Sequence, residues 1–207
     1  MFIGYYNYTV WLTYISLAVS AYGLIAAQEG RTPLAVLCLL ISGILDTFDG
    51  KVARTKKNRD DYQKKYGIQI DSLSDIVCFG LLAAVIAYQE GMKETPDVAI
   101  LLCYCVAGLI RLGYFNVMEE ERQKATAEKR SHYRGLPITS SSIFVPLYFV
   151  ITTLADFDHL LGWRLLMGGM GLLFILNIKV RKPGMKGLAV MGAVLVLAAA
   201  AYFIFGR

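Results

Sequence analysis

Long apolar segments recur along the chain and restrict it to a fold that spans a membrane. A transmembrane α-helix needs about 20 predominantly apolar residues. The 207-residue sequence holds seven segments near that length, at 8–28, 32–53, 68–89, 96–117, 137–155, 159–178 and 186–205. Only 18% of the residues are charged, against about 25% in soluble domains. We therefore expect an all-α, polytopic membrane helical bundle of six to seven transmembrane helices, with residues 1–207 forming one domain.

Lysines and arginines are distributed unevenly between the connections. Sixteen of the 21 lie in three of them, at 51–67, 118–136 and 179–186. Loops rich in Lys and Arg stay on the cytoplasmic side of a membrane. The pattern predicts a multi-pass protein of the cell membrane with these three loops in the cytoplasm. The cations would set the orientation in the membrane and attract anionic lipid headgroups. We therefore expect membrane lipids as partners and no nucleic acid.

Four aspartates interrupt the apolar segments where hydropathy disfavours them. Asp46 and Asp49 lie near the end of the second segment, and Asp71 and Asp75 near the start of the third. The spacings i, i+3 and i, i+4 place each pair on one helix face. A charge near the bilayer centre costs about 2.5–3.5 kcal/mol, so such residues are usually functional. Because the two segments are antiparallel neighbours, all four carboxylates can meet just below the cytoplasmic headgroups.

Four clustered carboxylates would repel one another unless cations lay between them. Oxygen ligands without nearby His or Cys favour Mg²⁺ or Mn²⁺ over zinc. We therefore expect one or two divalent ions held by Asp46, Asp49, Asp71 and Asp75. The alternatives are that these aspartates cap helices or pair with Lys51 and Arg54, or that they line the path of an ion channel or transporter. A channel would distribute its carboxylates through the membrane, whereas these gather at one edge.

Small residues and a cation accompany the carboxylates. Gly50 lets a ligand approach the backbone closely, Ala53 keeps the same face small, and Arg54 offers a planar fork for phosphate oxygens. Gly67 lies one turn before Asp71 and leaves room for a base or sugar. These residue types indicate a phosphate site beside the metal site.

The complete pattern is Asp46-x-x-Asp49-Gly50-x-x-Ala53-Arg54 followed by Gly67-x-x-x-Asp71-x-x-x-Asp75. It resembles the signature of the CDP-alcohol phosphatidyltransferases. The twelve residues between Arg54 and Gly67 make a longer loop than is common in that family. Three further stretches, at 70–80, 108–116 and 134–139, resemble the phosphatidylserine synthase branch of the family.

The resemblance implies a homodimeric helical bundle with a polar cavity open to the cytoplasm. It implies metal binding by Asp46, Asp49 and Asp71, with two Mg²⁺ or Mn²⁺ ions per site. Asp75 would contact metal and act as the general base. The CDP-lipid would contact Asp46, Asp49 and the small or cationic members of the signature, Gly50, Ala53, Arg54 and Gly67.

The expected reaction is attack by an alcohol on the phosphorus nearer the diacylglycerol, which expels CMP. No Ser/His/Asp triad or reactive Cys is evident, so direct displacement is favoured over a covalent enzyme intermediate. Serine is the expected acceptor, with CDP-diacylglycerol as the donor. Glycerol 3-phosphate, inositol phosphate and free inositol or choline remain alternatives, and so do ether-linked lipid donors.

Serine carries a carboxylate, so its pocket should contain a cation. Arg111 is embedded near the cytoplasmic end of the fourth segment, where an unpartnered arginine is costly. It could bind the carboxylate of serine or the lipid phosphate, and its alternative role is a structural pair with an aspartate. Further candidates for acceptor contacts are Asn116, Arg134 and Thr139, which would otherwise cap or begin helices.

Overall fold

The computed structural model describes residues 3–53, 55–56, 60–125, 132–154 and 158–181, together with residues 192–193, 196 and 200. Its long helices are α1 (Tyr8–Gln28), α2 (Thr32–Ala53) and α5 (Thr95–Ala125). A fourth long helix is continuous from α3 (Asp61–Asp75) through a π-helical turn, η1 (Ile76–Leu81), into α4 (Leu82–Gln89). The remaining elements are β1 (His132–Arg134), a 3₁₀ turn η2 (Ile138–Ser140), α6 (Ser141–Leu154), α7 (Leu160–Ile175) and β2 (Lys179–Arg181). The all-α bundle expected from the sequence is confirmed.

Helix starts follow local sequence signals. Both α2 and α5 begin with a Thr-Pro pair, at Thr32 and Thr95. Proline in the first turn loses no intrahelical hydrogen bond. Asp60 caps α3, because its carboxylate accepts from the backbone N–H of Gln63 at 2.7 Å. This cap starts the helix at Asp61, seven residues before the expected boundary of 68, so α3 extends beyond the apolar segment.

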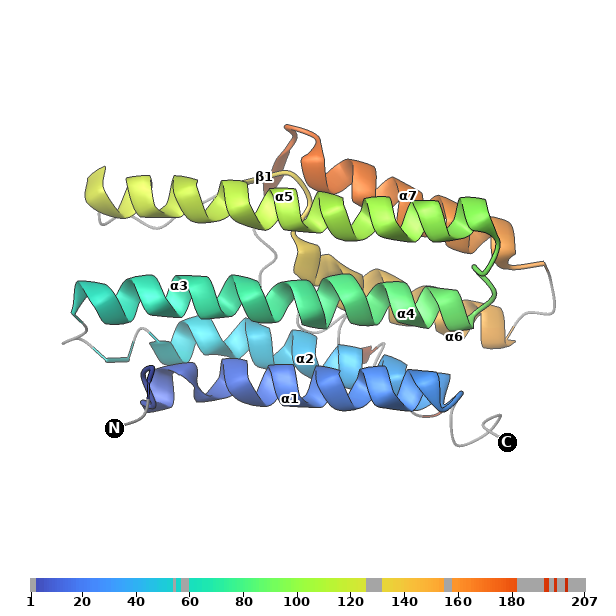
Figure 1. The fold of residues 1–207 in the computed structure, drawn as a ribbon, viewed down its shortest axis with the longest axis horizontal. Coiled ribbons are helices and arrows are strands. Elements are labelled where there is room, and N and C mark those ends of the chain that lie inside the picture. Colours follow the sequence, from blue (N-terminus) through green and yellow to red (C-terminus); the bar gives the residue numbers. More distant parts are fainter. Residues whose placement is uncertain are drawn as a thin grey trace.

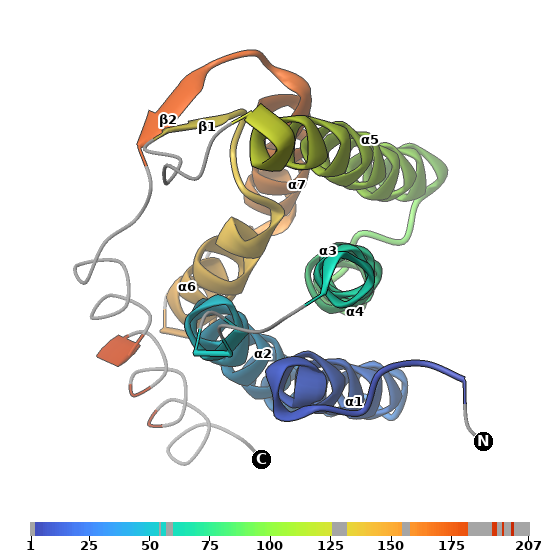
Figure 2. The same cartoon turned by 90° about the vertical axis from the view of Figure 1, so that its left-hand side faces the viewer.

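Successive long helices run in opposite directions along the long axis of the molecule, which is horizontal in Figure 1. The end-on view places α3 and α4 between α1 and α2 on one side and α5 on the other (Figure 2). Helix α6 packs against α2, and α7 packs against α5. Two ends of the bundle follow from this arrangement. The α2–α3 end holds the connection from α2 to α3, and the α4–α5 end holds the connection from α4 to α5.

Four helical segments are long and apolar enough to cross a membrane: Tyr8–Gln28, Thr32–Gly50, Asp61–Gln89 and Thr95–Glu121. Two shorter apolar helices, Ile138–Leu154 and Leu160–Ile175, follow them. These six match the first six predicted segments, and the seventh, 186–205, lies outside the described residues. Large apolar side chains also face outward, as Leu102, Leu109 and Ile110 do on α5, each more than half exposed. A helix that is apolar on all sides suits lipid surroundings.

The core is packed closely between helices. Its largest fully buried side chains include Trp163, Tyr104, Phe79 and Leu39. A Cβ added to Gly171 of α7 would lie 3.2 Å from the Cα of Tyr104 in α5, so these two backbones approach as small residues allow in membrane bundles. Helices α1 and α2 share a buried hydrogen bond of 2.7 Å between the Ser20 and Ser42 hydroxyls.

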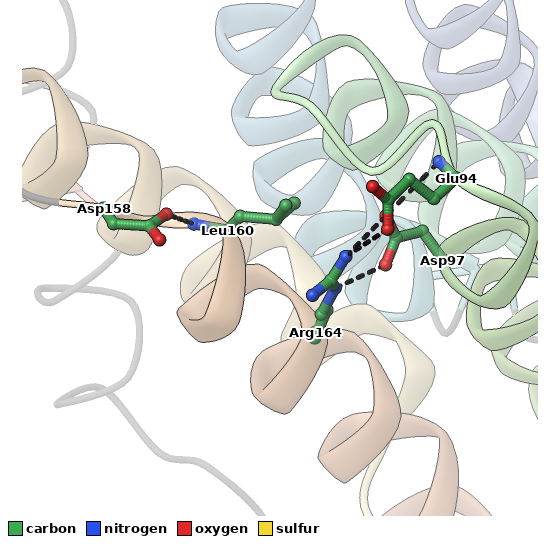
Figure 3. Close-up of polar contacts among 5 residues, drawn as sticks. All are labelled: Glu94, Asp97, Asp158, Leu160 and Arg164. Carbon is green, nitrogen blue, oxygen red and sulfur yellow. Dashed lines mark hydrogen bonds and ion pairs between the residues drawn. The ribbon is translucent and has the colours of Figure 1, made fainter.

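An ion pair joins α5 to α7 at the α4–α5 end (Figure 3). The Arg164 Nε and a terminal nitrogen donate to the two oxygens of Asp97, at 2.5 and 3.1 Å. The same terminal nitrogen also donates to Glu94 at 3.0 Å. The Asp97 side chain is fully buried, whereas Glu94 is mostly exposed.

A short antiparallel pair of strands was not expected from the sequence. The backbone of Tyr133 in β1 is paired in register with that of Val180 in β2. The chain leaves β1 through Gly135, which has a φ of +75° and whose N–H donates to the Ile178 carbonyl at 2.8 Å. A Cβ there would lie 2.6 Å from the Phe174 carbonyl oxygen. Only glycine fits both the conformation and the space, so Gly135 fixes the entry to η2 and α6 against the end of α7.

Candidate functional site

Three carboxylates meet between α2 and α3. Asp46 and Asp49 lie in the last two turns of α2, and Asp71 lies in the last turn of α3. One oxygen from each of the three side chains lies within 4.8 Å of the others. All three residues are partly buried. The structure therefore brings Asp71 to the pair Asp46 and Asp49, although more than 20 residues separate them along the chain.

The donor set fits a hard divalent cation. Three carboxylate oxygens at this spacing can surround an ion that prefers oxygen ligands, as Mg²⁺ and Mn²⁺ do. The group contains no His or Cys among the described residues, which disfavours zinc. Asp46, Asp49 and Asp71 are thus the residues that would hold a metal ion here.

Asp75 stands next to this group rather than within it. It is partly buried at the end of α3, and its carboxyl lies close enough to interact with Asp46, Asp71 and Asp49. It was predicted both to contact metal and to act as the base. Both roles stay predictions, and the group of three carboxylates does not include Asp75.

Helix α1 contributes contacts to the site that the signature does not include. The Thr13 hydroxyl donates to Asp49 Oδ2 at 3.4 Å, and the Thr13 carbonyl accepts from the Ser74 hydroxyl at 3.5 Å. Both residues are buried. Sequence reasoning missed Thr13 because a single threonine in an apolar segment carries no distinguishing spacing.

The other predicted contacts to a CDP-lipid surround the carboxylates along the chain. Gly50 lies one residue after Asp49 in α2, and Gly67 lies one turn before Asp71 in α3; both are partly buried. Ala53 is the last residue of α2. Arg54 lies outside the described residues. The described members of the signature therefore lie at the α2–α3 ends of these two helices.

Two predicted acceptor contacts lie on α5. Asn116 Oδ1 accepts a 2.8 Å hydrogen bond from the Ser72 hydroxyl, and Ser72 lies between Asp71 and Asp75 on α3. This bond joins α5 directly to the acidic helix. Arg111 is buried, with its guanidinium carbon 5.8 Å from the centre of the Phe115 ring, a distance typical of a cation–π contact.

The remaining two acceptor candidates lie at the start of the α6 region. Arg134 ends β1, and its side chain lies outside the described part of the structure. Thr139 is partly buried in η2, and its carbonyl accepts from the Ser142 hydroxyl at 2.7 Å. The latter contact is a helix-start bond.

The chain is similar to known proteins of one family. The sequence profile described as CDP-alcohol phosphatidyltransferase matches residues 6–175, which span α1 to α7 and all the site residues above. The CDP-diacylglycerol–serine O-phosphatidyltransferase of Saccharomyces cerevisiae is 34% identical over 124 residues, which cover 59% of this chain and 44% of the yeast protein.

Bacterial proteins of the same description are similar over comparable lengths. The one from Mycobacterium tuberculosis (strain H37Rv) is 27% identical over 133 residues, covering 64% of this chain and 45% of that protein. The one from Bacillus subtilis is 29% identical over 154 residues, covering 73% of this chain and 76% of that protein. The chain therefore spans less than half the length of its yeast and mycobacterial relatives and about three quarters of the Bacillus one.

Proposed function

Because the chain belongs to the CDP-alcohol phosphatidyltransferase family, we propose that it transfers the phosphatidyl group of CDP-diacylglycerol to L-serine, giving phosphatidylserine and CMP. The observation that carries this proposal is the meeting of Asp46, Asp49 and Asp71 from two helices within 4.8 Å. The names of its relatives support serine as the acceptor.

The carboxylates would bind the activated lipid through divalent ions. Asp46, Asp49 and Asp71 would hold Mg²⁺ or Mn²⁺, and Asp75 adds a fourth carboxylate that would suit a second ion. When bound, such ions neutralise phosphate charge and stabilise a departing phosphate. Gly50, Ala53, Arg54 and Gly67 would line the side on which the CDP moiety lies, with Arg54 donating to phosphate oxygens.

The transfer itself would be a single displacement. The serine hydroxyl oxygen forms a bond to the phosphorus nearer the diacylglycerol. The bond from that phosphorus to the bridging oxygen breaks, and CMP leaves with that oxygen and the bonding electron pair. Asp75 takes the hydroxyl proton, as a base within hydrogen-bond reach of the attacking group. Phosphoryl transfer depends mainly on positioning and charge neutralisation, and the carboxylates would supply both indirectly, by holding divalent cations against the phosphates.

Recognition of serine would come from α5 and the start of α6. Arg111 would pair with the serine carboxylate or the lipid phosphate. The Asn116 oxygen accepts from Ser72, so its amide nitrogen would be the atom that contacts the acceptor. Arg134 and Thr139 would close the pocket from the β1–η2 connection.

The placement in the cell follows from the same features. The basic loops would lie in the cytoplasm, so the α2–α3 end and the carboxylates would face the cytoplasmic side of the cell membrane. The lipid donor would enter from the surrounding membrane lipids. A homodimer is proposed from the family resemblance, with residues 1–207 acting as one domain.

The direct test is release of CMP by the purified protein in vesicles that contain CDP-diacylglycerol. Serine, glycerol 3-phosphate, inositol phosphate and inositol are supplied in parallel, with Mg²⁺ or Mn²⁺ present. We expect CMP and phosphatidylserine to form only with serine, and an Asp46→Asn variant to form neither. Turnover with glycerol 3-phosphate but not serine would contradict the acceptor, and no CMP release with any acceptor would contradict the reaction.

A further inference from the structure

The helix that carries Asp71 and Asp75 contains a π-helical turn immediately after Asp75. The turn, η1, covers Ile76–Leu81, and the N–H that follows it, on Leu82, donates to the Val77 carbonyl five residues back. The α-helical partner would lie four residues back. Such turns are rare and frequently occur at functional sites. Nothing in the signature of acidic residues accounts for this one.

A π-helical turn changes the direction in which the preceding side chains point. Each residue of an α-helix turns the chain by about 100° around the helix axis. One additional residue in a turn therefore rotates the preceding part of the helix by roughly 100° relative to the part that follows. The helix packs against the core after the turn, through side chains such as Leu82, Ala83 and Ile86, which are fully buried. With that part fixed, the turn decides whether Asp71 and Asp75 face α2 or point to one side of it.

Two hydroxyls from other helices hold the turn at its middle. The Phe79 carbonyl accepts from the Tyr104 hydroxyl of α5 at 2.7 Å and from the Ser141 hydroxyl of α6 at 3.0 Å. Tyr104 is 1% exposed and Ser141 is fully buried. The Ser141 hydroxyl also lies 2.6 Å from the Ile138 carbonyl, so its one proton is shared, and Tyr104 is the stronger partner of Phe79.

Close packing around the same turn restricts it further. A Cβ on Gly80 would lie 2.8 Å from Ile76 Cδ1, and a Cβ on Gly108 of α5 would lie 2.7 Å from Ile138 Cδ1. The two isoleucines therefore fill the spaces that the two glycines leave. Phe79 is fully buried in this tight apolar setting, so water cannot replace the two hydroxyls as hydrogen-bond donors to its carbonyl.

We propose that Tyr104 and Ser141 are positioning residues for the acidic site. By holding the Phe79 carbonyl they stabilise the π-helical turn, and the turn rotates α3 so that Asp71 and Asp75 meet Asp46 and Asp49. In the described part of the structure their hydroxyls bond to the Phe79 and Ile138 carbonyls and not to the carboxylates, so they would act through the rotation of the helix. This inference rests on the proposed function, because it takes the carboxylate cluster to be a divalent-metal site.

The test measures equilibrium binding of Mn²⁺ to the purified protein without substrates, by electron paramagnetic resonance of the free ion. Tyr104→Phe removes one donor and keeps the ring, Ser141→Ala removes the other, and the double variant removes both. We expect Tyr104→Phe to raise the Kd for Mn²⁺ about three- to tenfold and the double variant about tenfold or more. Ser141→Ala should have the smallest effect, because its proton is shared.

Tyr148→Phe is the matched control. Its hydroxyl donates to the His159 carbonyl at 2.8 Å, the same kind of bond, at the α4–α5 end and away from the carboxylates. It should lower thermal stability as Tyr104→Phe does, without changing the Kd for Mn²⁺. If the double variant is folded and binds Mn²⁺ as tightly as the wild type, Tyr104 and Ser141 have only a structural role and the proposal fails.

The same measurements distinguish a failure of the positioning role from a failure of the proposed metal site and transfer reaction. A wild type that binds no Mn²⁺ would overturn the metal site and the positioning role together. A wild type that binds Mn²⁺ and transfers phosphatidyl groups, with a double variant that does both equally well, would overturn the positioning role alone. If Tyr104→Phe does not fold, the Kd of Ser141→Ala for Mn²⁺ becomes the test. We still expect this variant to bind Mn²⁺ measurably more weakly than the wild type, and an unchanged Kd would overturn the proposal.

Discussion

Polar side chains of α1 and α5 lie at the acidic site. Asp49 accepts from Thr13, and Ser72 between the α3 carboxylates bonds to Asn116. The bond from Thr13 reduces the cost of placing the Asp49 charge within apolar helices. These neutral partners do not cancel the repulsion among three carboxylates whose oxygens lie within 4.8 Å of one another. A divalent ion bound between them would.

Asp75→Asn tests the proposed base. The amide keeps the shape of the side chain but cannot accept the proton of the acceptor hydroxyl, so we expect kcat for phosphatidyl transfer to fall about 10²- to 10⁴-fold. Binding of CDP-diacylglycerol should persist, since Asp46, Asp49 and Asp71 remain. Asp61→Asn, on the exposed first turn of the same helix, should leave kcat unchanged. Full transfer activity in Asp75→Asn would exclude this residue as the base.

Gly135→Ala tests the turn that leads into α6. The methyl group would meet the Phe174 carbonyl oxygen at 2.6 Å, and the φ of +75° disfavours any side chain. We expect a loss of roughly 2 kcal/mol or more in unfolding free energy, measured by thermal or denaturant unfolding in detergent. Gly169→Ala is the control, because its position in α7 has open space around it. An equal loss in both variants would contradict this explanation.

The helical elements follow the apolar pattern of the sequence closely, and their departures have local causes. The six described spans begin and end within a few residues of the predicted ranges except α3, which the Asp60 cap starts early, and α5, which continues to Ala125. The Asp60-x-x-Gln63 spacing could have revealed the first exception. The π-helical turn could not be predicted, because it depends on Tyr104 and Ser141 from helices distant in the sequence.

Arg164→Ala tests the link between α5 and α7. It would leave the fully buried Asp97 without its bidentate partner, and we expect a loss of about 2–3 kcal/mol in unfolding free energy. Glu94→Gln, at the exposed side of the same cluster, should cost under about 1 kcal/mol. Transfer activity at low temperature should survive in both variants, because the cluster lies at the α4–α5 end. Equal stabilities for the two variants would show that Asp97 does not depend on Arg164.

For the molecule as a whole, spacing and hydropathy predicted the bundle and the place of its acidic site. Asp46, Asp49 and Asp71 converge as their helix spacing required. The residues that sequence reasoning missed, such as Thr13 and Tyr104, belong to helices whose rotation and neighbours depend on tertiary packing. A lone hydroxyl in an apolar segment has no periodicity to distinguish it, so only the structure assigns its partner.

The central claim is that α2 and α3 hold the same metal ion, and Mn²⁺ binding to Asp46→Asn, Asp71→Asn and the double variant tests it. If one ion is shared, each single variant should weaken binding at least about tenfold, and the double variant should be little worse than either, since residues that act together are not additive. Losses that simply multiply, or a single variant that binds as tightly as the wild type, would show that the two helices do not share an ion.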